Sequence, residues 1–246
     1  MHVGIKDQDQ FDTALWMPFE SRFLNGKGEV NSKAVSEFLR TFLLTTGQYF
    51  APGETFEAFE QRFKGKLQTN NLVLELTKAA TLYDSIRGVL LHPDPETQIA
   101  LKKFQQLDSS TAFPLILKLM QMADSHQISA VELRTCLELL SGFIFRRYIC
   151  GESSRPYAQW FVSACKEVGA TEPVLTLERF LTERGSFPGD SRFEDSAVSS
   201  SMAKSTLLTF CNNWSIHLET RKRRMPIKLR SNTSCLRCYR KNGRMT

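Results

Sequence analysis

Apolar residues recur three and four positions apart through most of this sequence, and this spacing limits its fold more than any other feature. Side chains repeat on one face of an α-helix with that period, whereas a half-buried strand needs strict alternation, of which the sequence has no sustained run. We therefore expect an all-α, bundle-like domain over residues 1–205. The spacing predicts helices over 31–44, 72–90, 95–107, 113–124, 129–149, 156–168 and 173–184.

Local start and stop signals support several of these helices. Ser129 and Glu132 have the spacing of a capping box, and Asp94 stands directly before a proline, which favours a first helical turn. Asp190 is a candidate N-cap for a last helix beginning near Ser191, and Gly151 supplies a helix stop.

Three apolar faces are predicted to point into the core. The face of segment 129–149 should bury Leu140 near its middle, and a short segment before residue 64 repeats phenylalanine. The members of the three faces are Phe56, Phe59 and Phe63; Leu72, Leu76, Ala79, Tyr83, Ile86 and Leu90; and Leu133, Leu137, Leu140, Ile144 and Tyr148.

Charge is distributed unevenly along the chain. The net charge of +6 combines ten cations after Glu219, where no acidic residue occurs, with a net −4 over residues 1–219. The body therefore gives no reason to expect a nucleic-acid surface, while residues 206–246 form a basic tail that should have low order and bind DNA weakly and non-specifically.

Signals for a membrane, secretion or catalysis are missing from the sequence. No run of 18 apolar residues occurs, and acidic residues occupy the start, so no membrane is expected and a cytoplasmic location is predicted. There is no phosphate-binding glycine loop, nucleophile elbow or H-E-x-x-H motif, and His2, His92, His126 and His217 are scattered. No catalytic, cofactor-binding or metal-binding residue is therefore assigned. The cysteine pattern fits reduced thiols.

Arg146 and Arg147 are the most informative polar residues of the body. They follow Phe143, Ile144 and Phe145 at the end of the best predicted helix. Cations at a helix C-terminus complement its dipole, which is a sufficient explanation by itself. The alternative is a polar anchor, in which the guanidinium groups grip carboxylates of a neighbouring helix or domain. Both can hold at once.

An ordered set of motifs resembles the helical middle region of GmrSD-like proteins, which are type IV, modification-dependent restriction endonucleases. The most specific motif is FIFRRYICGE at 143–152, and the resemblance covers roughly residues 10–200. The other motifs are LWMPFE (15–20), FPLILKLM (113–120), ISAVELRTCLELLSG (128–142), Trp160-Phe161 and FPGDSRF (187–193).

The resemblance implies a protein with three regions, of which this chain is expected to contain the helical one. In that family a nucleotide-dependent domain with a DGQQR-type motif precedes the helical region, and an HNH nuclease with an E-H-I-M-P-Q-like motif follows it. Nucleoside triphosphate and a divalent metal are thus cofactors of the parent family, and neither motif occurs here. Arg146 and Arg147 match the family's hallmark arginines, for which a structural or interdomain role is expected.

The basic tail can be explained as a shifted reading frame. Read two bases later, the codons of residues 230–237 permit I-E-H-I-M-P-Q, with the histidine codon split between Asn232 and Thr233. The chain is therefore interpreted as an inactive, truncated endonuclease fragment whose partners are the other parts of the split enzyme.

Two other interpretations stay open. One is a free-standing helical interaction module, for example a regulator that pairs with an intact relative. The other is a DNA-binding protein that uses its basic tail, in which Cys235 and Cys238, with Cys211 and His217, could bind zinc.

Overall fold

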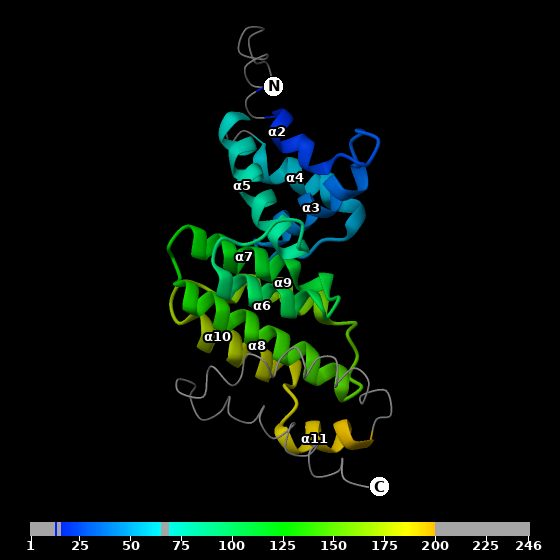
Figure 1. Cartoon of the computed structure of the whole chain (residues 1–246), viewed down its shortest axis with the longest axis vertical. Coiled ribbons are helices and arrows are strands. Elements are labelled where there is room, and N and C mark those ends of the chain that lie inside the picture. The colour runs from blue at the N-terminus through cyan, green and yellow to red at the C-terminus, as the bar shows by residue number, and fades with distance from the viewer. Residues whose placement is uncertain (1–12, 14–15, 65–68, 200–246) are drawn as a thin grey trace. The chain divides into compact units, whose positions relative to one another are not determined.

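The computed structural model describes residue 13, residues 16–64 and residues 69–199. Over these residues the fold is all-α, as predicted, and the one β contact in this part is an isolated bridge between Leu24 and Val30 (Figure 1). Short 3-10 turns precede or follow three of the helices. The α-helices are α2 (Met17–Glu20), α3 (Ser32–Leu44), α4 (Thr55–Phe63), α5 (Thr69–Arg87), α6 (Pro95–Gln105), α7 (Phe113–Asp124), α8 (Ala130–Ile149), α9 (Tyr157–Glu167), α10 (Pro173–Gly185) and α11 (Asp190–Ser199).

The contacts between residues divide the chain into two compact units. The first unit runs to Leu139 and includes Arg155–Phe180, and the second contains Leu140–Ser154 and the chain from Leu181 onward. Both α8 and α10 contribute to both units, because the borders fall inside these helices. The predicted domain border at residue 205 lies outside the described residues and stays a prediction.

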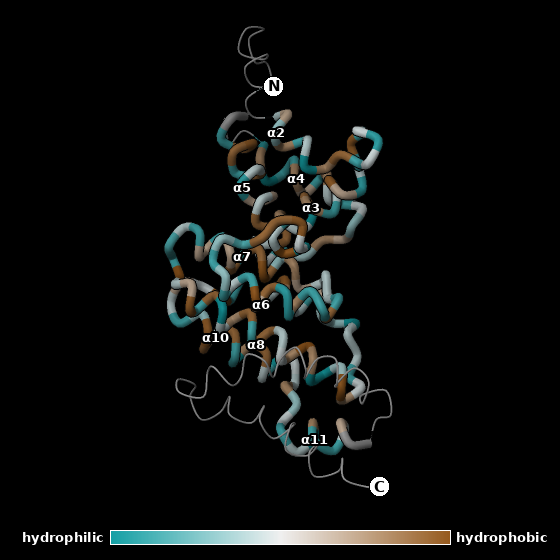
Figure 2. Tube along the Cα trace, in the orientation of Figure 1, coloured by the Kyte–Doolittle hydropathy of each residue, from teal (hydrophilic) through white to brown (hydrophobic). Residues whose placement is uncertain are grey.

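Helix α7 forms the apolar centre of the first unit. Most of its residues are apolar, as the colours along the tube in Figure 2 indicate, and Leu115, Ile116 and Leu117 are fully buried in succession. Helices α3, α5 and α9 all pack against it. A helix that is polar only along the edge of Lys118, Gln121 and Asp124 must be covered on most of its surface, which explains its place between three others.

Aromatic rings build the other half of this core. Phe19, Phe23 and Phe38 form a chain of ring contacts with centroids 5.3–5.4 Å apart, and Phe38 continues to Tyr83 of α5 at 5.5 Å. All four are buried. Such tilted pairs add to the stabilisation from area burial. Aromatic rings thus join α2, α3 and α5, and the ion pair between Arg22 and Asp84 at 2.8 Å adds a polar contact to α5.

Helix α5 ends three residues earlier than the predicted segment 72–90. Gly88 adopts a φ of 77°, the Val89 N–H donates to the Asp84 carbonyl, and the Gly88 N–H donates to the Ser85 carbonyl. These two bonds form a Schellman motif, which ends a helix at a left-handed glycine. The prediction that Leu90 belongs to the buried face was therefore wrong: it lies beyond the stop and is 40% exposed.

Two aromatic residues that were predicted to face the core are exposed. Phe56 in the first turn of α4 is 73% exposed, whereas Phe63 at its end is buried. Tyr148 is 54% exposed, although Leu133, Leu137, Leu140 and Ile144 before it are buried as predicted. Both errors fall in a terminal turn, where a neighbouring element no longer covers the whole stripe.

The predicted caps of α8 and α6 are present. The Ser129 Oγ accepts from the Glu132 N–H at 3.2 Å, and the Glu132 carboxylate accepts from the Ser129 N–H at 2.8 Å, which completes the capping box. Asp94 caps α6 by accepting from the Thr97 N–H at 3.0 Å. It also accepts from Arg134 of α8 at 3.0 Å, so one carboxylate joins two helices.

Asp94 makes the stability of the first unit depend on pH. Its hydrogen bond from the Thr97 hydroxyl, followed by the contacts with the Thr97 N–H and Arg134, holds the pKa of the carboxyl below its ordinary value. A depressed pKa in the folded state contributes stability above about pH 4 that is lost as the pH falls through the folded pKa. Asp94→Asn should therefore cost about 1 kcal/mol at pH 7 and progressively less below pH 4.

Urea unfolding followed by circular dichroism at pH 7 and at about pH 3 measures this difference. Asp124→Asn is the matched control, because Asp124 is an exposed carboxylate at the C-terminal end of α7. An equal loss at both pH values for Asp94→Asn would mean that the carboxylate charge is not what joins α6 to α8.

Candidate functional site

The end of α8 places two arginines inside the second unit. Gly151, with a φ of 70°, stops the helix: the Glu152 N–H donates to the Arg147 carbonyl and the Gly151 N–H to the Tyr148 carbonyl. This Schellman motif is the stop that the sequence predicted. Arg146 and Arg147 therefore sit in the last turn, where their charge complements the helix dipole.

Arg146 contacts the connection between α10 and α11, residues 186–189, and the first residue of α11. It donates to the Pro188 carbonyl at 3.1 Å and pairs with the Asp190 carboxylate at 2.7 Å. Its guanidinium carbon also lies 4.9 Å from the Phe193 ring centroid and 6.0 Å from that of Phe187. The residue is 9% exposed, so it is a buried cation that is bound by oxygen atoms and aromatic faces.

Arg147 contacts the last residue of α10, Gly185, which is three residues before Pro188. It donates to the Gly185 carbonyl, to the Ser153 carbonyl at 3.1 Å, and pairs with Glu152 at 3.5 Å. Its guanidinium lies over the Phe143 ring at 5.5 Å, and the residue is 4% exposed. A planar fork can serve two carbonyls and a carboxylate at once, which an ammonium group cannot do with the same geometry.

The α10–α11 connection has the shape that these contacts require. A Cβ added to Gly185 would overlap the Phe143 ring, so any larger residue there would force the ring to shift. Ser186 adopts a φ of 48°, a left-handed conformation that side chains rarely adopt. Phe187 then packs on Phe143 with centroids 5.5 Å apart. The Phe143 and Phe187 rings and the two arginines thus all contact this turn.

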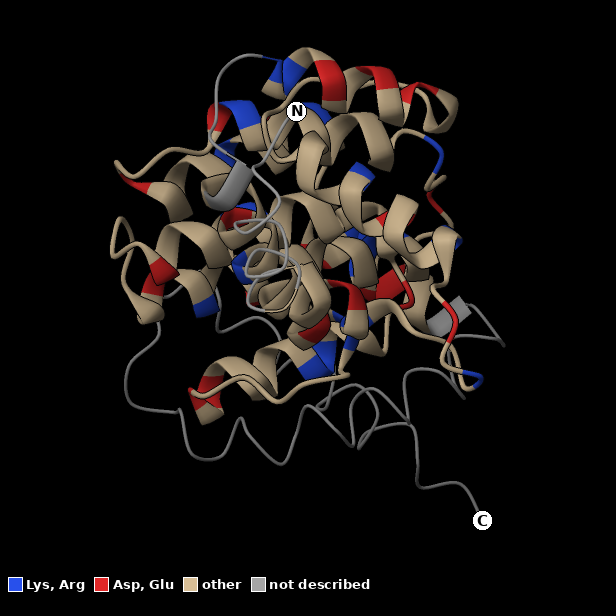
Figure 3. Cartoon of the chain, turned by 90° about the horizontal axis from the view of Figure 1, so that it is seen from above, with Lys and Arg blue, Asp and Glu red and all other residues tan. Residues whose placement is uncertain are grey.

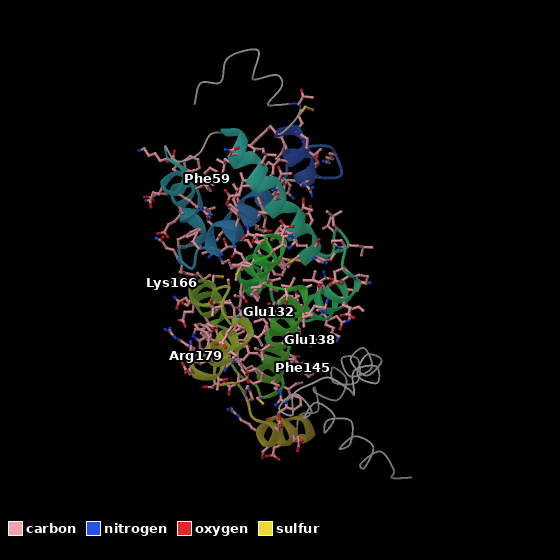
Figure 4. The ribbon with its side chains drawn as sticks, turned by 90° about the vertical axis from the view of Figure 1, so that its left-hand side faces the viewer. Phe59, Glu132, Glu138, Phe145, Lys166 and Arg179 are labelled. Atoms are coloured by element: carbon pink, nitrogen blue, oxygen red, sulfur yellow. The ribbon has the colours of Figure 1, made fainter. Side chains whose placement is uncertain are left out.

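A further ion pair extends the network onto α11. Arg192 pairs with Glu152, the carboxylate that Arg147 also contacts. The Phe193 ring packs on Phe145, labelled in Figure 4, with centroids 6.0 Å apart. We call this set of contacts, centred on Arg146 and Arg147, the arginine anchor. Its chemistry is that of binding and positioning, because each guanidinium is engaged by groups of the same unit.

Arg146 and Arg147 show the position that one interpretation requires and contacts of the kind that the other requires, while their structural or interdomain role stays a prediction. The arginines lie in the last turn of α8, and they also grip another segment. Their partners differ from the expectation: carbonyls of the connection bind them as well as carboxylates. Asp190 was predicted as an N-cap before Ser191, but α11 begins at Asp190 and the carboxylate pairs with Arg146.

Gly185, Ser186 and Arg192 were not identified as site residues from the sequence. A backbone carbonyl acceptor and a close glycine approach leave no residue-type pattern. The one available signal was that FPGDSRF, which contains Phe187, Asp190 and Arg192, belongs to the same resemblance as the arginines.

Of the four histidines, His92 and His126 fall within the described residues, and they lie in separate loops. His92 lies in the loop between α5 and α6 and accepts from the Asp94 N–H, and His126 has a φ of 57° just after α7. Within the described ranges, no group of three histidine, cysteine or acidic residues could hold a metal ion. Burial raises the pKa of the Cys136 and Cys165 thiols to about 12, so these thiols stay protonated.

The distribution of charge and hydropathy over the described helices does not indicate a further binding surface. Basic and acidic residues are interspersed along the ribbon (Figure 3). Among the helices that the structure describes, none combines the length and apolar character needed to cross a membrane. The tail cysteines Cys211, Cys235 and Cys238 and the basic tail lie outside the described residues. The zinc and DNA-binding hypotheses, which concern them, stay predictions.

Comparison of this chain with protein-family models, curated proteins and solved structures found no match.

Proposed function

We propose that this chain is the helical middle region of a GmrSD-like, modification-dependent DNA restriction endonuclease, and that it acts as a non-catalytic connector. One observation carries the proposal. The two stretches that give the resemblance its arginines and its FPGDSRF motif, residues 143–152 and 187–193, form one network through Arg146–Asp190 and Arg192–Glu152. If the motifs belong to one structural feature of the family, we expect motifs that are distant in the sequence to contact each other in the fold.

The role proposed for the connector is to fix the direction in which the chain runs from α10 into α11. Arg146 and Arg147 hold the α10–α11 connection, and in the resembling family the nuclease follows the helical region. An intact relative would need nucleoside triphosphate and a divalent metal, which stabilises the scissile phosphate. No catalytic step is assigned to the described residues here, and the chain by itself is proposed to be inactive.

The nucleotide sequence across codons 195–246 tests the origin of the tail. The proposal expects codons that encode I-E-H-I-M-P-Q two bases out of frame and a nuclease that continues in that frame. It also expects an upstream frame with the DGQQR-type motif. Codons for residues 230–237 that exclude the shifted motif would contradict the frameshift.

A phage challenge tests the function. The gene with its upstream and shifted downstream frames rejoined should lower the plating of a phage whose DNA carries modified bases, while the present chain should not. In the rejoined gene, Arg147→Ala should abolish protection, and Arg179→Ala should keep it because Arg179 is an exposed residue of α10. Protection by the present chain alone would overturn the proposed inactivity.

A second candidate is an interaction module that regulates an intact relative, and one exposed loop favours it. Val89, Leu90 and Leu91 are consecutive and are 62%, 40% and 75% exposed. The hydrogen bonds that start at Gly88 and end at Asp94 fix this loop. Exposed apolar runs of this kind are rare without a partner.

Expression of the full chain beside an intact relative tests the second candidate. Phage restriction by the relative should change, and Leu91→Ser should remove that change while leaving the fold intact. If restriction is the same with and without the chain, the regulatory function is excluded.

A further inference from the structure

Helix α11 depends on other elements for its existence. It has ten residues, and isolated helices of that length are marginal in water. Among its side chains that the structure describes, Phe193 alone is a buried hydrophobic residue. The helix therefore forms because something outside it holds it in place.

The contacts that fasten α11 to the end of α8 are to a large extent charged and accessible to water. Asp190 pairs with Arg146 at 2.7 Å, yet the Asp190 side chain is 51% exposed. Arg192 pairs with Glu152, and the Arg192 side chain is 57% exposed. Each pair joins one such exposed side chain to a more buried one, Arg146 at 11% and Glu152 at 24%, so salt screens the pairs in part. The Phe193 ring contact with Phe145 is the apolar part of this attachment.

The arginines themselves are attached to α8 and to residues outside α11. Arg147 keeps the Gly185 and Ser153 carbonyls, and Arg146 keeps the Pro188 carbonyl, whether or not α11 is present. Loss of α11 thus removes the Asp190 carboxylate and the Phe193 ring from Arg146 and one cation from Glu152, but it leaves the carbonyl contacts of the anchor in place.

We propose that α11 is a detachable helix: it leaves α8 and unfolds as a unit, at low cost and in a salt-dependent manner, while α8 stays folded. Such local opening is expected for segments with few buried apolar contacts. Release turns Phe145 and the Asp190 side of Arg146 toward solvent and frees the chain from its fixed exit at the end of α8. The inference uses contacts of the second unit alone and holds whether or not the proposed function is correct.

Native-state hydrogen exchange of the full chain, read by mass spectrometry on peptides, tests the proposal. At low salt, peptides within Asp190–Ser199 should be protected but exchange far faster than peptides from the middle of α8. Raising sodium chloride to about 1 M should speed exchange in α11 about five-fold or more and leave α8 unchanged. Protection in α11 equal to that in α8, or no protection at low salt, would overturn the proposal.

Replacement of Arg192 distinguishes the effect of its ion pair with Glu152 from its effect on the intrinsic stability of α11. Arg192 lies in the first turn of α11, where a cation opposes the helix dipole, so its removal would favour an isolated helix. Arg192→Gln should nevertheless speed α11 exchange about two- to five-fold at low salt, because the Glu152 pair is lost. At high salt the variant and the unaltered chain should converge.

Asp195→Asn is the matched control on the same helix. Asp195 is exposed, and the structure gives it no ion pair among the described residues. Its neutralisation should not speed α11 exchange at either salt concentration. Acceleration by Asp195→Asn as large as that by Arg192→Gln would mean that net charge, rather than the pairing with α8, governs the helix, and the proposal would fail.

Discussion

Replacing Arg147 with alanine should lower the free energy of unfolding by about 3–5 kcal/mol, the range for breaking a buried ionic network by removal of one partner. The substitution leaves the Gly185 and Ser153 carbonyls without their donor and takes the cation from the buried side of Glu152. It also leaves a cavity against the Phe143 ring, which the guanidinium now covers. Urea unfolding of the full chain, followed by circular dichroism, measures the loss.

Two comparisons identify the cause of that loss. Arg179→Ala removes an exposed arginine from α10 and should change stability by less than about 0.5 kcal/mol. Arg147→Lys keeps the charge but not the fork, and should lose about 1–3 kcal/mol because one ammonium cannot reproduce the same set of contacts. Full stability of Arg147→Lys would show that charge alone matters, and full stability of Arg147→Ala would refute the anchor.

Local sequence signals predicted the helices well because their causes are local. The capping box of Ser129 and Glu132, the Asp94 cap and the Gly151 stop each involve groups within five positions of one another. Apolar spacing predicted the buried face of α8 because a helix repeats its side chains geometrically. The same reasoning failed at Leu90, where a left-handed Gly88 ends α5 before the spacing does.

The arginine anchor could be predicted only in part. The sequence placed Arg146 and Arg147 in the last turn of α8, where their charge complements the helix dipole. The anchor hypothesis followed because guanidinium groups bind carboxylates well. Their acceptors at Gly185 and Pro188 are backbone carbonyls, which every residue has, so no pattern of side chains points to them. The border between the two units could not be predicted from the sequence either, because it falls inside α8 and α10, where the helical spacing of apolar residues continues without a break.

Leu140→Ala should cost about 2–5 kcal/mol of unfolding free energy through lost transfer energy and the cavity that remains. Leu140 is fully buried and lies in α8 as the first residue of the second unit. From Leu140 to Arg147, seven of the eight residues are buried and Gly142 is half-buried, so neighbours on every side limit how far the site can collapse. Incomplete collapse favours the upper half of the range.

Two control substitutions, one of an exposed leucine and one of an exposed tyrosine, show whether burial causes the loss of stability. Leu175→Ala removes the same atoms at a position that is 57% exposed, and should cost less than about 1 kcal/mol. Tyr148→Ala lies on the stripe that the sequence assigned to the core, but its 54% exposure predicts a small loss too. A cost for Tyr148→Ala as large as that for Leu140→Ala would mean that the Tyr148 side chain contributes to the core, as the apolar spacing predicted. A cost below about 0.5 kcal/mol for Leu140→Ala would instead place the wrong face of α8 inside, because truncation of a buried leucine cannot be that cheap.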